Sequence, residues 1–213
     1  MNQSNLNNFH NAVPSDYYHQ GVNKNFLQKL WHNQRKKAIK AVVQMTGGTL
    51  LDLGSHGGYL TEFIAQQTNA SKVIVVDISR QAINFIKKNK PDWHAICANI
   101  EKPLDIMDQS ADIITSFDVF EHLNNPEKTI KEAKRILKPG GSFIIGVPNE
   151  TLLWKIVWFA WTKFGPGKVW HEVHVQNYSK KSLNDLFLKY GFTKKLELTT
   201  HLGMYKINKY EYE

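Results

Sequence analysis

The sequence has a single cysteine, and this scarcity excludes one class of scaffold. Cys97 has no partner within the chain, so a small domain held together by disulfides is excluded. Because Cys97 ends an apolar run, we predict a buried thiol rather than a reactive one. The first eleven residues lack a basic region followed by an apolar one, so no secretory signal is expected. These features predict a cytoplasmic protein.

Acidic residues are also relatively scarce. The chain has 27 Lys and Arg against 19 Asp and Glu, a net charge of +8. An excess of this kind suits nucleic acid, an acidic substrate or an anionic membrane surface. The lysines are spread along predicted helices, as in Lys36-Lys37 and Lys87-Lys88, rather than gathered in one block. We therefore expect solvated helix faces and no nucleic-acid partner.

The length and composition fit one globular domain. The chain has 213 residues, of which 42% are hydrophobic and 22% charged. The polar N-terminus predicts a flexible segment over 1–22, which leaves 23–213 as a single domain.

Hydrophobic periodicity predicts an α/β fold. Helix-like and strand-like segments alternate, which indicates a Rossmann-like, doubly wound and mostly parallel sheet. Ligands of such sheets bind at the carboxyl ends of the strands. The predicted strands are 49–53, 72–76, 93–97, 111–116, 141–147, 193–198 and 204–211. The predicted helices are 23–45, 58–68, 79–89, 126–137, 151–164 and 179–190.

A glycine-rich stretch after the first of these strands organises the chain. Asp52 ends the strand, and Gly54, Ser55 and Gly58 lead into a helix, so the backbone can approach a ligand closely. Asp77 ends the next strand, about 25 positions after Asp52. In nucleotide-binding βαβ units an acid at that position binds the ribose hydroxyls. The two acids therefore predict a nucleoside site.

Four segments in this order, 51–58, 76–79, 117–123 and 137–145, give the chain a family resemblance. From about residue 17 to the C-terminus it resembles the class I S-adenosylmethionine-dependent methyltransferases. It is most similar to the branch that includes ubiquinone-biosynthesis O-methyltransferases. One position departs from the family pattern acid-x-Gly-x-Gly-x-Gly, because His56 occupies the place of the middle glycine.

The resemblance implies a seven-stranded sheet, with the last strand antiparallel to the fifth, and S-adenosyl-L-methionine as cofactor. Arg35 lies where the family can place an arginine that binds the methionine carboxylate; the alternative is a surface arginine on a basic helix. Asn99 stands where the family usually has an acid near adenine. The cofactor-binding residues implied are Arg35, Asp52, Gly54, Ser55, Gly58, Asp77, Ile78, Asn99, Ile100 and Phe117.

Three histidines are candidates for a catalytic base. A hydroxyl acceptor would be helped by a base with a pKa near 7, which favours histidine. His122 closes the motif 117–122, where the resemblance implies a structural or pocket-lining role as the alternative to a base. The family uses the loop that holds His171 and His174 for acceptor binding. The alternatives for this loop are structural hydrogen bonding and metal binding, but one loop supplies too few ligands for us to predict a metal site.

The segment 151–178 differs from the rest of the chain. Trp154, Trp158 and Trp161 fall on one face of its predicted helix, which is shorter than the roughly 20 apolar residues that span a bilayer. This pattern predicts a hydrophobic lid over the acceptor or peripheral contact with the inner face of a membrane. The alternative is an insertion buried in the core or in a homodimer interface.

The implied function is methyl transfer to a small or lipid-like acceptor. The Asn-Pro-Pro-aromatic tetrad that the family uses for amino groups of bases and glutamine is absent, since 117–120 reads Phe-Asp-Val-Phe. Its absence favours an oxygen or carbon acceptor, with oxygen preferred. The alternatives are an RNA or protein methyltransferase, favoured by charge alone, and a non-catalytic cofactor-binding module, favoured by His56.

Overall fold

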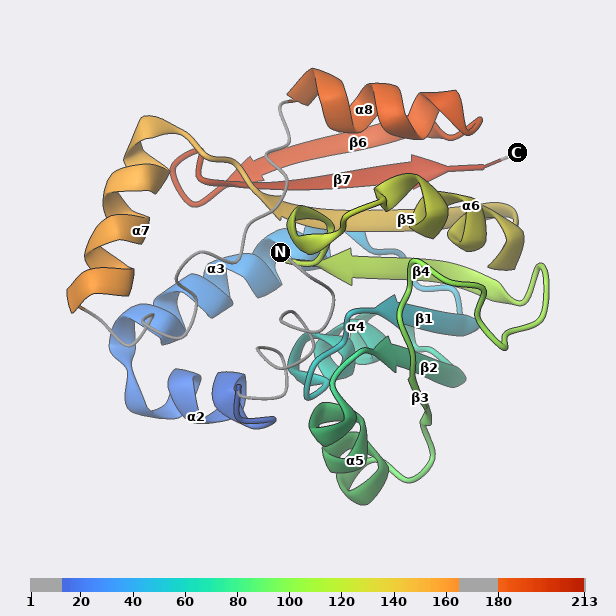
Figure 1. The fold of residues 1–213 in the computed structure, drawn as a ribbon, viewed down its shortest axis with the longest axis horizontal. Coiled ribbons are helices and arrows are strands. Elements are labelled where there is room, and N and C mark those ends of the chain that lie inside the picture. Colours follow the sequence, from blue (N-terminus) through green and yellow to red (C-terminus); the bar gives the residue numbers. More distant parts are fainter. Residues whose placement is uncertain (1–12, 165–179, 213) are drawn as a thin grey trace.

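The computed structural model describes residues 13–164 and 180–212, which build a seven-stranded sheet between two layers of helices (Figure 1). The strand order is β3-β2-β1-β4-β5-β7-β6. Strands β1 to β5 pair in parallel, whereas β7 lies antiparallel to both β5 and β6, as the resemblance implied. The strands are β1 (Thr49–Leu53), β2 (Lys72–Asp77), β3 (His94–Cys97), β4 (Ala111–Phe117), β5 (Leu137–Pro148), β6 (Thr193–Thr200) and β7 (Tyr205–Glu211).

Each face of the sheet buries its own apolar cluster. Successive strand side chains point to opposite faces, so Leu51 and Leu53 pack with α6 and α8, whereas Leu50 packs with α3 and α4. Helix α5 covers the outer strands on the second face, against Val73 and Val75. The helices are α2 (Tyr17–Lys24), α3 (Phe26–Val42), α4 (Tyr59–Thr68), α5 (Arg80–Asn89), the short 3₁₀ helix η1 (Phe120–His122), α6 (Pro126–Ile136), α7 (Leu152–Phe164) and α8 (Lys180–Lys189).

The predicted elements are present, with one notable shift. Strand β5 begins at Leu137 instead of 141, because Leu137 pairs with Ala111 before a register irregularity in the β4–β5 ladder. Gly140 lies within this stretch at φ +75°, a conformation that favours glycine. Periodicity cannot detect such an irregular extension, since the side-chain alternation is interrupted there.

Helix α2 overlaps the segment that we predicted to be flexible. Val13 is only 2% exposed, and the Tyr18 ring makes edge contacts with His32 and His56 at centroid distances of 5.4 and 5.5 Å. Val13 and Tyr18 thus anchor a segment whose average composition is polar. Residues 1–12 lie outside the described part of the chain.

Cys97 is exposed, so the prediction that it is a core residue was wrong. It ends β3, which is an edge strand of the sheet. The Cys97 thiol donates to the Ile78 carbonyl at 3.7 Å. An apolar run at a sheet edge is buried less than one at the centre, and the local sequence does not distinguish the two.

Helices α2, α3 and α7 lie beyond the carboxyl ends of the parallel strands, on the left of Figure 1. Trp154 of α7 is 8% exposed and stacks on Trp158 with a centroid distance of 5.0 Å. Among the described helices none is long and apolar enough to cross a bilayer. These three helices therefore cover the edge of the sheet where ligands of parallel sheets bind.

Candidate active site

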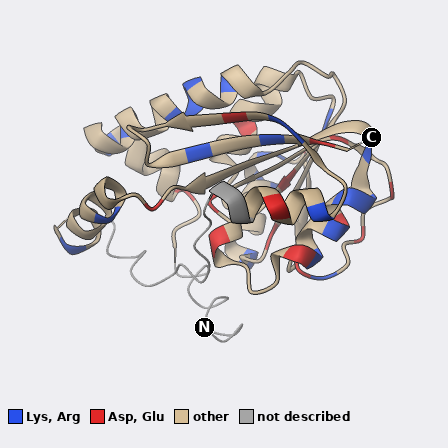
Figure 2. Ribbon diagram, turned by 90° about the horizontal axis from the view of Figure 1, so that it is seen from above, with Lys and Arg blue, Asp and Glu red and all other residues tan. Residues whose placement is uncertain are grey.

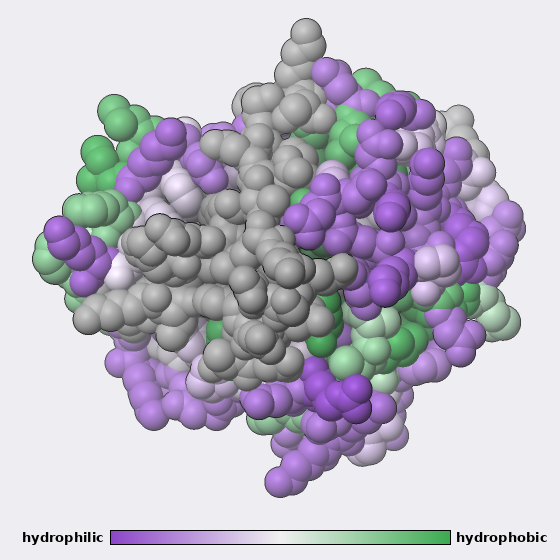
Figure 3. Space-filling view, in the orientation of Figure 1, coloured by the Kyte–Doolittle hydropathy of each residue, from purple (hydrophilic) through white to green (hydrophobic). Residues whose placement is uncertain are grey.

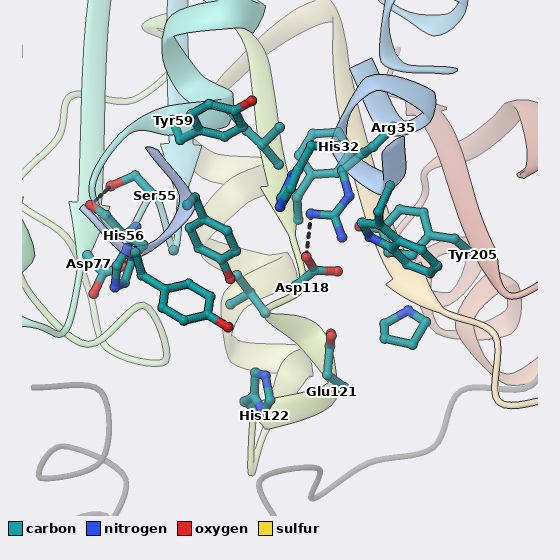
Figure 4. Close-up of a pocket in the computed structure, with 18 of the residues that line it drawn as sticks. His32, Arg35, Ser55, His56, Tyr59, Asp77, Asp118, Glu121, His122 and Tyr205 are labelled. Carbon is teal, nitrogen blue, oxygen red and sulfur yellow. Dashed lines mark hydrogen bonds and ion pairs between the residues drawn. The ribbon is translucent and has the colours of Figure 1, made fainter. Parts of the chain in front are cut away.

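A cavity of about 500 Å³ lies at the carboxyl ends of β1, β2 and β4, under α2, α3 and α7 (Figures 1 and 4). It brings together nearly all of the predicted cofactor residues, which come from five separate stretches of the chain. Those that line it are Arg35, Asp52, Gly54, Ser55, Asp77, Ile78, Asn99, Ile100 and Phe117. Gly58 instead lines a smaller neighbouring cavity against α5.

The turn after β1 depends on glycine at its first position. Gly54 has φ +84°, and a Cβ there would lie 2.2 Å from Val119 Cγ2. The Gly54 N–H donates to the Val76 carbonyl at 2.8 Å, and Ser55 N–H to the same oxygen at 3.3 Å. Since these two amides are engaged within the fold, the turn's contribution to the cavity is the close approach of its backbone to Val119 in the loop after β4.

His56 keeps the backbone conformation of the glycine that it replaces. Its φ is +46°, in the left-handed region that most residues avoid. Its N–H donates to Asp77 Oδ2 at 2.7 Å, and its ring contacts Tyr18. These contacts help to hold a residue with a Cβ in a conformation that favours glycine.

Asp77 holds the turn and still faces the cavity. Its Oδ2 accepts from His56 N–H, and its Oδ1 accepts from Ser79 N–H at 2.8 Å. Each carboxylate oxygen has a second lone pair. Each oxygen can therefore accept one more hydrogen bond, and the binding of ribose hydroxyls at the tip of β2 stays a prediction.

Asp52 and Asn99 are also engaged by the fold itself. Thr61 and Thr115 donate hydroxyl hydrogen bonds to the Asp52 carboxylate, the latter at 2.7 Å. Burial raises the pKa of Asp52 to about 6, although these two hydrogen bonds oppose the shift. Asn99 Oδ1 accepts from Glu101 N–H at 2.8 Å, which leaves it one further lone pair toward the cavity.

Arg35 is buried, which rules out the alternative of a surface arginine. It forms an ion pair with Asp118 at 2.6 Å, and its guanidinium lies over the Tyr205 ring at 4.6 Å from the centroid (Figure 4). Burial alone would lower the pKa of Arg35, but Asp118 beside it raises that pKa above its ordinary value. Among the described residues Arg35 Nε has no hydrogen-bond partner, so a donor remains for a ligand.

Of the three predicted catalytic histidines, the structure places one. His122 ends η1 and lines the cavity. His171 and His174 lie outside the described residues. The tryptophans Trp154, Trp158 and Trp161 line the cavity too, so the described part of segment 151–178 forms one of its walls.

Sequence reasoning missed several groups that face the cavity. Glu121 is 3% exposed, and burial raises its pKa well above the ordinary value. Tyr18 comes from α2 and Tyr205 from β7, and both line the cavity. Glu121 stands in the segment 117–123, where its neighbour His122 appeared the better base. No local pattern links Tyr205 to this site, since it arrives with the last strand.

The family assignment rests on comparisons with known proteins. The profile described as "Methyltransferase domain" matches residues 20–197. A ubiquinone biosynthesis O-methyltransferase of Coxiella burnetii is 30% identical over 120 residues, covering 54% of this chain and 50% of its own length. A protein of Mycobacterium tuberculosis named as a probable S-adenosylmethionine-dependent methyltransferase is 24% identical, covering 78% and 57%. The chain thus spans about half the length of these curated relatives.

A solved structure shows the same fold. A SAM-dependent methyltransferase from Thermotoga maritima superposes with a TM-score of 0.73 at 20% sequence identity, covering 98% of this chain and all of that one. At this identity the likeness establishes the fold alone, whereas the profile spans most of the chain. With the predicted motifs gathered at one cavity, the chain belongs to the class I S-adenosylmethionine-dependent methyltransferase family.

Proposed function

We propose that this protein transfers a methyl group from S-adenosylmethionine to an oxygen atom of a small or lipid-like acceptor. The observation that carries the proposal is the division of the cavity. One end has Asp77 and the glycine turn, and another wall consists of the indole rings of α7. A polar cofactor end beside an apolar wall suits a hydrophobic acceptor.

The cofactor's proposed contacts follow from the side chains at the strand ends. Asp77 accepts from the ribose hydroxyls, Asn99 and Ile100 border adenine with Ile78, and Arg35 donates to the methionine carboxylate. Asp52, Gly54, Ser55, Gly58 and Phe117 shape the floor and the turn. When bound, the cofactor supplies an electrophilic methyl group, so the protein has to contribute positioning, a dry cavity and a base.

The oxygen acceptor is supported by two observations. The segment 117–120 lacks the tetrad typical of amino-methylating enzymes, and a relative at 30% identity is named a ubiquinone biosynthesis O-methyltransferase. His122 borders the cavity and remains a candidate base, as do His171 and His174 of the loop outside the described residues.

Replacing Asp77 with alanine is expected to weaken binding of S-adenosylhomocysteine by about 1–3 kcal/mol, the scale for losing hydrogen bonds to a charged group. Isothermal titration calorimetry measures the affinity, and Asp92→Ala, which removes an exposed carboxylate, is the matched control. Asp77 also holds His56 N–H, so Asp77→Asn, which keeps an oxygen acceptor, should lose less.

Two results would count against these assignments. No binding of S-adenosylhomocysteine by the unaltered protein would contradict the proposed function and favour a non-catalytic module. Unchanged affinity in Asp77→Ala, with circular dichroism showing an intact fold, would contradict only the ribose assignment.

We also propose peripheral contact with an anionic membrane, through a different surface than the three tryptophans that line the cavity. The outer side of α7 exposes Ile156 (59%) and Phe159 (58%), and α3 exposes Leu27 (63%) and Leu30 (51%). Figure 3 shows this hydrophobic colouring at the position of α7. Leu27 and Leu30 also line the cavity, so the surface continues into its mouth.

The charge of the same helices supports this contact. Helices α2, α3 and α7 contain no Asp or Glu. They carry Lys24, Lys29, Lys155 and Lys163, which lie within four positions of the exposed apolar residues in the sequence. Figure 2 colours the Lys and Arg of the ribbon blue and the Asp and Glu red. Lysines beside apolar residues are typical of helices that lie in the interface of an anionic bilayer.

The double variant Ile156→Glu/Phe159→Glu is expected to bind phosphatidylglycerol vesicles about tenfold more weakly or worse, because it removes two large apolar side chains and adds negative charge. Co-sedimentation measures the binding, and Leu196→Glu on β6 is the control for an exposed leucine elsewhere. If only the triple variant Trp154→Ser/Trp158→Ser/Trp161→Ser binds the vesicles more weakly, the tryptophans make the membrane contact and the proposed surface does not.

A further inference from the structure

One carboxyl oxygen in the cavity has no hydrogen-bond partner in the part of the chain that the structure describes. This atom is Glu121 Oε2, which forms no hydrogen bond to any described residue. Glu121 is only 3% exposed, so water has little access to the atom. The Glu121 carboxyl group accepts a hydrogen bond from the residue's own backbone N–H. Native proteins rarely leave a buried carboxyl oxygen unpaired, and in a cavity such an atom points to a ligand.

The position of Glu121 separates it from the cofactor residues. Figure 4 shows its carboxyl group pointing into the cavity, beside Asp118 and away from Asp77 and the glycine turn. The apolar wall from α7 borders the same cavity. A ligand group at Glu121 would therefore belong to the acceptor and not to the nucleoside.

We propose that Glu121 binds the hydroxyl group of an otherwise apolar acceptor, an alcohol or a phenol, and takes its proton during methyl transfer. This inference rests on the proposed function. The acceptor O–H bond breaks, and its proton passes to Glu121 Oε2. The acceptor oxygen bonds to the methyl carbon as the carbon–sulfur bond breaks, with that electron pair remaining on sulfur. The sulfonium becomes a neutral thioether, and Glu121 later returns its proton to solvent.

The electrostatic surroundings suit this role. Burial raises the pKa of Glu121 well above its ordinary value, and the charge of Asp118 adds to the rise. A base whose pKa lies nearer the working pH accepts a proton more effectively than an ordinary carboxylate. Arg35 opposes the shift, but it is paired with Asp118. The ionisable groups that face Glu121 are Asp118 after β4, Arg35 of α3, Glu150 after β5, Tyr18 of α2 and Tyr205 of β7.

A matched pair of probes tests the proposal: 2-naphthol, and naphthalene, which lacks the hydroxyl. Both are titrated into the protein saturated with S-adenosylhomocysteine. We expect tenfold or greater preference for 2-naphthol, because a site built to bind a hydroxyl rejects an analogue without it. The preference should grow as pH rises through the pKa of Glu121, since a carboxylate accepts more strongly than a carboxylic acid.

Variants assign the preference to one side chain. Glu121→Gln should reduce it below about threefold and remove its pH dependence, while the affinity for S-adenosylhomocysteine stays within about twofold. Glu121→Asp, which keeps a carboxylate, should retain part of it. Glu101→Gln should keep it, because this acid of the same cavity already accepts from Asn125 N–H. Methyl transfer to 2-naphthol should fall about 10²–10⁴-fold in Glu121→Gln.

Several results would overturn the proposal. Equal binding of the two probes, a preference that survives Glu121→Gln, or one lost in Glu101→Gln would contradict the binding role. Hydroxyl-dependent binding without any Glu121-dependent methyl transfer would contradict the role as base. If S-adenosylhomocysteine binds and the hydroxyl preference is missing, only this inference fails; if S-adenosylhomocysteine does not bind, the proposed function fails.

Discussion

Replacing Arg35 with alanine is expected to destabilise the protein by about 3 kcal/mol and to weaken cofactor binding about tenfold or more. Removing one partner of a buried ion pair typically costs about 3–5 kcal/mol, because the other charge stays behind without compensation. The Asp118 side chain is 25% exposed, so solvent reduces the cost to the lower end of this range. The expected affinity loss follows from the proposed charged hydrogen bond between Arg35 and the methionine carboxylate.

Urea unfolding and titration with S-adenosylhomocysteine measure the two effects. Lys37→Ala, an exposed cation on the same helix, controls for loss of charge. Asp118→Asn separates the loss of stability from the loss of cofactor affinity. This variant should also destabilise the protein, but it releases the Arg35 guanidinium and should leave the cofactor affinity unchanged or increased. Equal affinity loss in Arg35→Ala and Lys37→Ala would contradict the carboxylate assignment.

Local signals in the sequence were sufficient for the parallel sheet. Strands such as Lys72–Asp77 are nearly continuous β-branched runs, and glycines or polar residues mark their ends. The residues that follow each strand could therefore be placed at one edge before their neighbours were known. The start of β5 could not, because its first residues pair across an irregularity set by the partner strand.

The part of the cavity around Arg35 and α7 depends on tertiary contacts that no local pattern encodes. Arg35 is buried because Asp118 arrives from the loop after β4, and Tyr205 arrives with the last strand. Helix α7 illustrates a second limit. Its period identified the face that holds Trp154 and Trp158, but the opposite face is also apolar, so periodicity could not decide which one the protein buries.

The glycine turn allows a test of how tightly the turn after β1 packs against Val119 in the loop after β4. Gly54→Ala is expected to destabilise the protein by about 2–5 kcal/mol. A left-handed conformation costs a residue with a Cβ about 1–2 kcal/mol, and relieving crowding in a packed interior adds typically about 1–3 kcal/mol. The crowding arises because the new Cβ would lie 2.2 Å from Val119 Cγ2.

Gly140→Ala is the matched control for this substitution. Gly140 has a similar φ, +75°, but nothing lies within 4 Å of its would-be Cβ, so only the conformational cost applies. Urea unfolding should show the larger loss in Gly54→Ala. Because Val119 lines the cavity, that variant should also bind S-adenosylhomocysteine more weakly, whereas Gly140→Ala should not. Equal losses of stability would mean that Val119 moves aside freely, and the close approach of the Gly54 turn to Val119 would then contribute little to the shape of the site.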